Sequence, residues 1–341
     1  MTALCAVVAL CVASAAATER YVPAQYVTIQ GAIDACVAGD EVIIADGTYT
    51  GAGNKNLDFK GLAITVRSAS GDPATCIIDC EGSGRGFYFH SGETAESAVR
   101  GLTIQNGNVT TMTPGGGGGV YCDSVSPILT NCAIVGNGAS LGGGVYCYSG
   151  TPTLIDCVIV GNVTTYTYGT GGGLYADCSN PNLTNCTIND NIACHAGGGV
   201  YCLASDVILI DDTIAGNTVA GAEGRGGGVG CEDYSSATLT NCLISGNVAS
   251  DEYGAGGGVY CSWYSDATLT NCTVVHNIAA NAGGMYCYHS SVALVNCILW
   301  ANTPQQAHAY GGSTLVRYCD VQGGWSGTGN IVRFNQLVTS Y

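Results

Sequence analysis

The sequence of 341 residues contains few charged residues and few aromatic residues other than tyrosine. Only 10% of its residues are Asp, Glu, Lys or Arg, and 9 Lys and Arg stand against 25 Asp and Glu. Between residues 107 and 316 the single Lys or Arg is Arg225. Nucleic acids and anionic membrane surfaces require clustered Lys and Arg that displace counterions. The composition therefore excludes both partners and favours neutral glycans, cations or other proteins.

The sequence also lacks an apolar run long enough to cross a bilayer, which takes about 20 residues. Residues 3–13 are an apolar stretch that is followed by small residues at 14–17. This pattern is typical of a secretory signal peptide, so we expect residues 1–17 to be removed on export. The mature protein would then be secreted or displayed at the cell surface, with no transmembrane span.

Glycine is abundant, with 52 residues, and much of it belongs to a repeated segment. Seven times between residues 107 and 302, two or three glycines precede an apolar residue, and a motif of the type Leu-Thr-Asn-Cys-x-Ile-x-Gly-Asn follows. A unit of 25 to 30 residues cannot bury its own apolar face, so the copies must stack into a solenoid. The apolar positions are Val120, Val145, Leu174, Val200, Val229, Val259 and Met285.

Each repeat predicts one coil of three short β-strands. Apolar residues alternate with period 2, as in residues 268–270, and no helical period extends far enough for a helix. Glycine and asparagine supply the corners between strands. We therefore predict an all-β fold, a right-handed parallel β-helix of about ten coils, in which like side chains stack about 4.8 Å apart and corner amides hydrogen-bond along the stack.

The two ends of the chain depart from the repeat. Residues 28–37 have apolar residues at helical spacing, which predicts a short amphipathic helix that caps the first coil. Residues 18–106 then form the cap and the first coils, and residues 107–302 form the seven-repeat body. Residues 303–341 hold a last coil and an irregular stretch without an obvious cap. We expect this edge to self-associate or to continue in a longer chain.

The sequence contains 20 cysteines, and 18 remain once Cys5 and Cys11 are removed with the signal peptide. Disulfides persist outside the cell, and the Cα atoms of cysteines stacked one coil apart would lie about 5 Å from one another, within disulfide range. We therefore favour disulfides between coils, with a buried ladder of free thiols as the alternative. The spacing shows no paired CxxC motif, which argues against zinc.

Two segments resemble a known family. Residues 26–35 and 39–49 resemble the N-terminal coil of secreted bacterial right-handed β-helix proteins of the pectate-lyase-like superfamily. Residues 143–146 and 159–162 resemble the repeats of polymorphic outer membrane proteins. The resemblance implies this fold, secretion or outer-membrane display, and a lyase that would use an Arg or Lys base with calcium ligands. No motif supports calcium, so we expect no cofactor.

The residues themselves do not support catalysis. Arg225 lies in a glycine-rich loop beside Glu223, and we interpret it as a solvated loop charge. Asp211 and Asp212 replace the Asn-Cys pair of the other coils, but adjacent strand residues point to opposite faces, so we interpret them as repeat drift. We predict no catalytic residue and no metal ligand.

The remaining signal is aromatic. Six tyrosines occupy one repeat position, where strand alternation turns them outward, and Gly230 interrupts the row. Such a row could stack on sugar rings along a polysaccharide or pack on its own neighbours. A second group follows the cysteine of two coils. The candidate contacts are Tyr121, Tyr146, Tyr175, Tyr201, Tyr260 and Tyr286 in the row, with Tyr234, Trp263 and Tyr264 in the second group.

We therefore predict a non-catalytic extracellular or cell-surface protein that binds a polysaccharide or cell-surface glycan and serves adhesion. Two alternatives remain open. A polysaccharide lyase or glycoside hydrolase of the pectate-lyase-like type would release unsaturated products or reducing ends. A structural envelope or filament component would assemble end to end.

Overall fold

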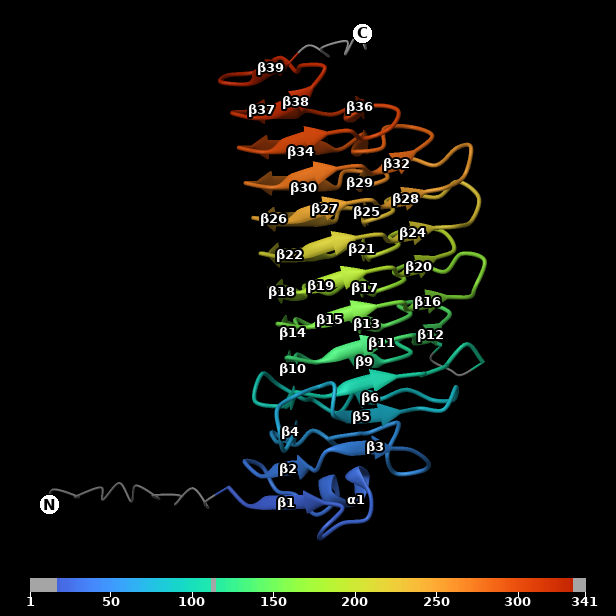
Figure 1. The fold of residues 1–341 in the computed structure, drawn as a ribbon, viewed down its shortest axis with the longest axis vertical. Coiled ribbons are helices and arrows are strands. Elements are labelled where there is room, and N and C mark those ends of the chain that lie inside the picture. The colour runs from blue at the N-terminus through green and yellow to red at the C-terminus, as the bar shows by residue number, and fades with distance from the viewer. Residues whose placement is uncertain (1–16, 112–114, 334–341) are drawn as a thin grey trace, which may run out of the picture.

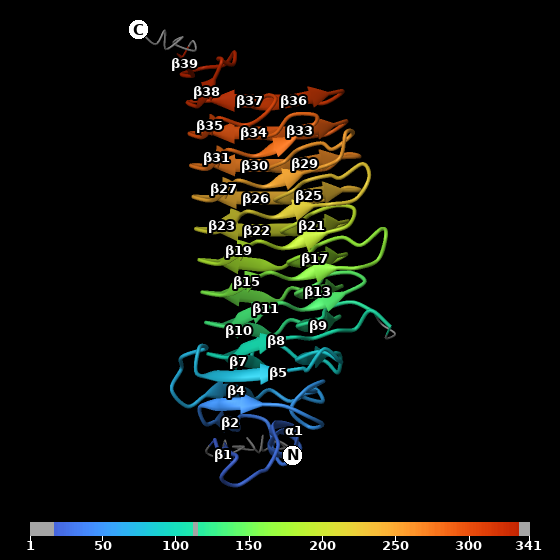
Figure 2. The same ribbon diagram turned by 45° about the vertical axis from the view of Figure 1, so that its right-hand side comes forward.

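The computed structural model describes residues 17–111 and 115–333. The chain winds into a rod whose coils stack from β1 (Glu19–Val22) to β39 (Ile331–Arg333), as Figures 1 and 2 show from two sides. Neighbouring coils pair through parallel strands along the whole rod, for example β1 with β2 (Glu41–Ile44) and β38 (Asp320–Gln322) with β39. These pairings confirm the predicted parallel β-helix.

Four sheets, which we call A to D, run along the rod. Sheet A contains β1, β2, β4 (Thr65–Ser68), β7 (Ala98–Arg100), β10 (Ile128–Thr130), β14 (Thr153–Ile155), β18 (Asn182–Thr184), β22 (Asp206–Ile210), β26 (Ser236–Thr240), β30 (Asp266–Thr270), β34 (Ser291–Val295) and β37 (Thr314–Arg317). Sheet B contains β3 (Gly47–Tyr49), β5 (Cys76–Asp79), β8 (Thr103–Gln105), β11 (Ala133–Val135), β15 (Val158–Val160), β19 (Thr187–Asn189), β23 (Thr213–Ala215), β27 (Leu243–Ser245), β31 (Thr273–Val275), β35 (Ile298–Trp300), β38 and β39.

Sheets C and D complete each coil. Sheet C contains β6 (Phe87–Phe89), β9 (Val120–Asp123), β13 (Val145–Tyr148), β17 (Leu174–Asp177), β21 (Val200–Leu203), β25 (Val229–Glu232), β29 (Val259–Ser262), β33 (Met285–Tyr288) and β36 (Ala307–Tyr310). Sheet D contains β12 (Gly138–Ala139), β16 (Val163–Thr164), β20 (Ile192–Ala193), β24 (Thr218–Val219), β28 (Val248–Ala249) and β32 (Ile278–Ala279).

The coil count and the cap differ from the prediction. Sheets A and B each contain 12 strands, so the rod has about 12 turns and not about ten. The two edge strands β1 and β39 lie outside the recognisable repeat, which is why the sequence does not indicate them. Helix α1 (Ile29–Ile33) is shorter than the expected residues 28–37. Thr28 is its N-cap, with Oγ1 accepting a hydrogen bond from the backbone N of Gly31 at 3.1 Å.

Stacked apolar side chains fill the interior. Sheet A contributes an inward leucine from most coils, and sheet B contributes an isoleucine that lies in register with its neighbours, such as Ile134, Ile159 and Ile188. Because every coil repeats the same inward positions, the core extends along the whole rod. Among the described residues, no helix is apolar and long enough to cross a bilayer. The predicted signal peptide lies, except for residue 17, outside the described residues.

A ladder of buried asparagines forms one corner of the rod, as predicted. Asn162 Nδ2 donates to Asn191 Oδ1 at 2.9 Å and to the carbonyl oxygen of Ile134 at 2.9 Å. The same amide contacts recur from coil to coil, so each polar group of the corner is satisfied inside the core. The ladder consists of Asn137, Asn162, Asn191, Asn217, Asn247, Asn277 and Asn302.

The glycine triplets lie beside this ladder. At Gly142 the backbone φ is +56°, a conformation that a side chain disfavours. A Cβ on Gly143 would lie 2.6 Å from the carbonyl oxygen of Gly172, and one on Gly144 would lie 2.9 Å from Asn162 Nδ2. The triplets are therefore required by positive φ and by the close approach of the next coil.

All 18 cysteines among the described residues are free thiols, so the disulfides that we favoured do not occur in the structure. Most point into the core, where Sγ donates to a carbonyl of the preceding coil, as from Cys157 to Leu129 at 3.6 Å. Cys231, Cys261 and Cys287 are also paired in register. Cys261 has a thiol neighbour on both sides, whereas Cys147 lies between Cys122 and Ala176, and the thiols are free in both places. The structure thus shows the alternative, the thiol ladder.

Candidate functional site

The six repeat tyrosines form one column on the outer face of sheet C. Tyr121, Tyr146 and Tyr175 are paired in register, and their ring centroids lie 5.0 Å apart at each step. Tyr260 and Tyr286 stack at 5.8 Å with their planes 3° apart. The column confirms that alternation turns these side chains away from the core.

The column is nevertheless almost closed to solvent. Tyr121, Tyr175 and Tyr201 are each 5% exposed, and Tyr146 is 8% exposed. The rings face one another along the rod, so their faces are covered and their edges point outward. The Tyr146 hydroxyl also donates to Asp177 Oδ2 at 2.9 Å. From Tyr121 to Tyr201 the column therefore forms a second core and offers no row of open ring faces to a sugar.

Gly230 breaks the column, and Arg225 lies beside the break. Gly230 is paired with Tyr201 on one side and with Tyr260 on the other. The guanidinium of Arg225 lies 5.9 Å from the ring centroid of Tyr260, a cation–π contact. Its Nη1 lies 3.3 Å from Glu232 Oε1. The side chain of Arg225 is thus fixed by Glu232 and Tyr260 and is 28% exposed, so it is not the solvated loop charge that we expected.

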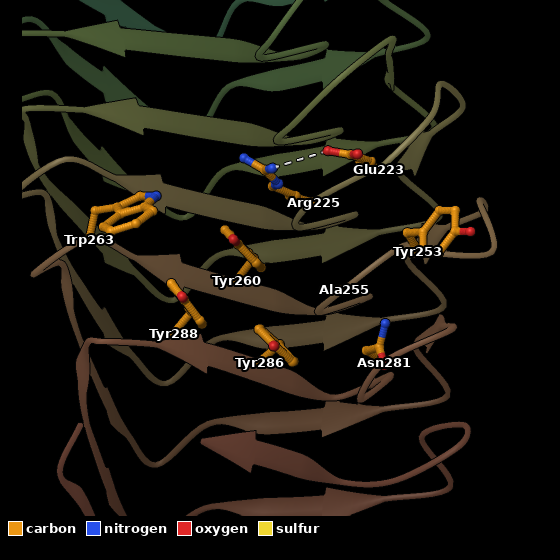
Figure 3. Close-up of a pocket in the computed structure, with 9 residues that line it drawn as sticks. All are labelled: Glu223, Arg225, Tyr253, Ala255, Tyr260, Trp263, Asn281, Tyr286 and Tyr288. Atoms are coloured by element: carbon orange, nitrogen blue, oxygen red, sulfur yellow. Dashed lines mark hydrogen bonds and ion pairs between the residues drawn. The ribbon is translucent and has the colours of Figure 1, made fainter. Parts of the chain in front are cut away.

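Below this break lies a groove of about 310 Å³, which we call the Tyr260 groove. Tyr260 and Tyr286 form its floor, with Arg225 at one end (Figure 3). Trp263 and Tyr288 line one side in this view, and the opposite side comes from the loops that carry Glu223, Tyr253 and Asn281. Aromatic surfaces and a few convergent polar groups are the usual lining of a small-molecule or sugar site.

The aromatic side of the groove results from one extra residue in two neighbouring coils. Three residues separate Cys231 from Ser235, and three separate Cys261 from Ser265, where the adjacent coils have two. The longer corner has two consecutive left-handed residues, with φ of +55° at Trp263 and +62° at Tyr264, where the shorter corner of the next coil has one, His289 at +48°. Hydrogen bonds between coils hold this corner, such as Trp263 N to the carbonyl oxygen of Tyr288 at 3.2 Å.

The inserted aromatics are exposed, unlike the tyrosine column. Tyr234 is 74% exposed and Tyr264 is 65% exposed, and their rings stack at 5.4 Å. Trp263 is 48% exposed and packs edge to face with Tyr288 at 5.4 Å. The structure therefore brings Trp263, Tyr260 and Tyr286 together at the groove and places Tyr234 and Tyr264 at the adjoining corner. Tyr260 is 6% exposed and so is as buried as the four tyrosines from Tyr121 to Tyr201, whereas Tyr286 is half-buried and Trp263 is exposed.

Electrostatics distinguish Asp212 from its neighbour Asp211. Asp212 is 1% exposed, and its Oδ1 accepts a hydrogen bond from the backbone N of Cys186 at 2.5 Å. Burial raises the pKa of Asp212 to about 7. Asp211 is exposed and accepts a hydrogen bond from Asn241 Nδ2 at 2.9 Å. The two carboxyl groups thus occupy different environments. The cause is not the strand alternation that we expected, since the pair lies in the corner between β22 and β23, where Asp211 has a left-handed backbone with φ of +58°.

Sequence reasoning missed the network around Arg225. The Tyr201 hydroxyl donates to Glu232 Oε2 at 3.0 Å, and Glu223 Oε2 lies 3.5 Å from Arg225 Nη2. One feature of the sequence could have indicated it. Arg225, the only Lys or Arg of the seven-repeat body, belongs to the same coil as Gly230, which replaces the repeat tyrosine. Among the described residues, no three His, Cys, Asp or Glu side chains are grouped as metal ligands would be.

The fold defines the class of the protein as a parallel β-helix with an aromatic-lined lateral groove. The model of the right-handed β-helix region matches residues 42–205 and 192–332. The chain therefore belongs to the right-handed β-helix family, as the segments at residues 26–49 suggested. No curated protein sequence matches it.

The solved structure of a pectate lyase supports this fold. The pectate lyase Pel9A is 15% identical, with a TM-score of 0.53 over 92% of this chain and 77% of that chain. The Dettilon tailspike protein gp208 is 12% identical, with a TM-score of 0.48 over 92% of this chain and 67% of that chain. The A-module of the mannuronan C-5 epimerase AlgE4 from Azotobacter vinelandii is 12% identical, with a TM-score of 0.40 over 86% and 82%. At 15% identity, the likeness to the pectate lyase shows the fold alone.

Proposed function

We propose that the protein is a non-catalytic, exported glycan-binding protein that serves adhesion at the cell surface, and that the Tyr260 groove is its binding site. The observation that carries the proposal is a groove of about 310 Å³ that combines the aromatic floor of Tyr260 and Tyr286 with the exposed Trp263. Aromatic rings pack against the apolar faces of sugars, and the polar groups at the rim accept or donate hydrogen bonds to hydroxyls. The predicted signal peptide and the fold shared with a pectate lyase support export and a polysaccharide partner.

Affinity electrophoresis in native gels that contain soluble polysaccharides tests this proposal. We expect at least one polysaccharide to retard the protein, and Trp263→Ala to weaken the binding roughly tenfold, since an aromatic contact contributes about 1 kcal/mol beyond its buried area. Tyr318→Ala is the matched control, because Tyr318 is 59% exposed, also has positive φ at +56°, and does not line the groove. Equal weakening by both variants would refute the site.

The alternative of a polysaccharide lyase or hydrolase has one observation in its favour. Arg225, Glu223 and Glu232 bring a cation and two carboxylates together at the Tyr260 groove, and such groups serve proton transfer in polysaccharide cleavage. Incubation with the polysaccharides that bind, followed by assays for reducing ends and unsaturated products, distinguishes the two functions. We expect no products. Turnover that Glu232→Gln abolishes would establish the enzyme.

A further inference from the structure

We infer that the Tyr260 groove selects neutral sugar rings and rejects uronates, because the one cationic side chain that lines it, Arg225, is already paired with two carboxylates of the chain itself. The inference rests on the proposed glycan-binding function and specifies the chemical class of its ligand. Among the described residues that line the groove, Arg225 is the only Lys or Arg. Recognition of a sugar carboxylate would have to come from this guanidinium.

The guanidinium of Arg225 is engaged on both outer nitrogens. Nη1 lies 3.3 Å from Glu232 Oε1, and Nη2 lies 3.5 Å from Glu223 Oε2. Glu232 is fixed in turn, since its second oxygen accepts the Tyr201 hydroxyl at 3.0 Å and its side chain is 12% exposed. A carboxylate binds arginine best through two parallel hydrogen bonds from the guanidinium. A uronate would therefore have to displace an acidic side chain that the fold already holds there.

The surroundings add negative charge and no compensating positive charge. The backbone N of Glu223 donates to Asp251 Oδ2 at 2.7 Å, which places a third carboxylate on the loop side of the groove. His195 comes from a neighbouring coil, and burial, followed by the charge of Arg225, lowers its pKa, so it is neutral at pH 7. One cation thus faces three carboxylates, and the whole chain carries a formal charge of −16. An anionic polymer is repelled at the site and during its approach.

A neutral sugar meets complementary groups at the same place. The carboxylate of Glu223, which is 64% exposed, accepts hydrogen bonds from sugar hydroxyls, and the Asn281 amide at the groove can donate or accept them. The exposed Trp263 and the half-buried Tyr286 provide apolar surface for the C–H face of the ring. In this arrangement Arg225 holds Glu223, which accepts the sugar hydroxyls, and is not itself the receptor.

The test compares neutral and uronate polysaccharides in the same native gels at pH 7, at low and at physiological salt. The neutral probes are mixed-linkage β-glucan, arabinoxylan and galactomannan, and the uronate probes are polygalacturonate and alginate. We expect retardation by at least one neutral probe, with an affinity for either uronate that is at least tenfold weaker. Tighter binding of a uronate than of every neutral probe would overturn the inference and leave glycan binding intact. Retardation by none of the five probes would overturn both proposals.

Carboxylate-neutralising variants test the physical cause. Glu223→Gln together with Glu232→Gln keeps the side-chain shapes and removes the two negative charges that are paired with Arg225. We expect affinity for polygalacturonate to rise at least tenfold, and to fall again when Arg225→Gln is added. Glu223→Gln alone is the second variant, because Glu223 is exposed and its replacement leaves the Tyr201 hydrogen bond intact. An absence of gain in both the double and the single variant would overturn the inference.

Discussion

Asp212 allows the most quantitative test of the packed repeat. It takes the position that cysteine occupies in the neighbouring coils, such as Cys186 and Cys242. Its Oδ1 accepts one hydrogen bond from the backbone, while Oδ2 is buried without a hydrogen-bond partner. A carboxylate in this place is poorly compensated, so ionisation destabilises the folded state. Asp212→Cys restores the residue of the other coils and removes the titration.

The size and sign of the effect follow from the pKa. Burial raises the pKa of Asp212 from 3.8 to about 7, so the folded state holds its proton more tightly than the unfolded state. The folded protein therefore loses stability as pH rises between these two values. At 1.36 kcal/mol per unit the full loss is about 4 kcal/mol, and roughly 2 to 3 kcal/mol of it falls between pH 5 and pH 8.

Thermal unfolding of the wild type and of Asp212→Cys at pH 5 and pH 8 measures this loss. The new thiol stays mostly protonated up to pH 8, because an unperturbed cysteine has a pKa of about 8.5. The two proteins share every other titrating group, so the change in their difference between the two pH values reports chiefly on Asp212. We expect the variant to gain roughly 2 to 3 kcal/mol relative to wild type on going to pH 8, or roughly 3 to 5 °C in Tm for a chain of this length. The control Asp156→Asn changes an exposed carboxyl at the corresponding corner position two coils away and should show no such pH-dependent gain. A difference that stays constant with pH would refute a buried, proton-binding Asp212.

Two further outcomes concern the interior ladders. Asn247→Ala removes the acceptor of Asn217 and the donor to Ile214, so we expect a loss of roughly 3 to 5 kcal/mol in denaturant unfolding. Asn271 instead belongs to an exposed row of amides, in which its Nδ2 donates to Asn241 Oδ1 at 3.0 Å, and its backbone φ is +56°. Asn271→Gly should therefore cost less than about 1 kcal/mol, and equal losses for the two variants would contradict the stabilising role of the buried ladder. For the thiols, alkylation in denaturant without reductant should label the buried cysteines, and a disulfide-linked peptide in mass spectrometry would contradict the free-thiol columns.

The repeat predicts the rod because its chemistry is local and recurs. Glycine triplets, the Asn162 type of corner and the inward cysteines each allow only a narrow set of conformations, so the coils, the amide ladder and the outward tyrosines are predictable. The end strands β1 and β39 are not, since their sequences lack the repeat. The orientation of the tyrosine rings could not be predicted from the sequence either, because it depends on stacking between coils that are 25 or more residues apart.

The groove could be predicted only in part, because it lies where the repeat fails. Gly230 removes one ring of the column, and the extra residue near Trp263 turns an aromatic side chain outward. The sequence identifies both deviations, and it also identifies Arg225 as an isolated cation. It does not indicate that the loops fold back so that Arg225 meets Glu232, since loop conformation is not constrained by the repeat.

The most direct measurement is a crystal structure of the protein soaked with an oligosaccharide of whichever neutral polysaccharide retards it. We predict a sugar ring over Tyr260 and Tyr286, in contact with Trp263, while the Arg225–Glu232 ion pair stays intact. A sugar bound on another face of the rod, or one whose binding separates Arg225 from Glu232, would contradict the assignment of the Tyr260 groove as a site for neutral glycans.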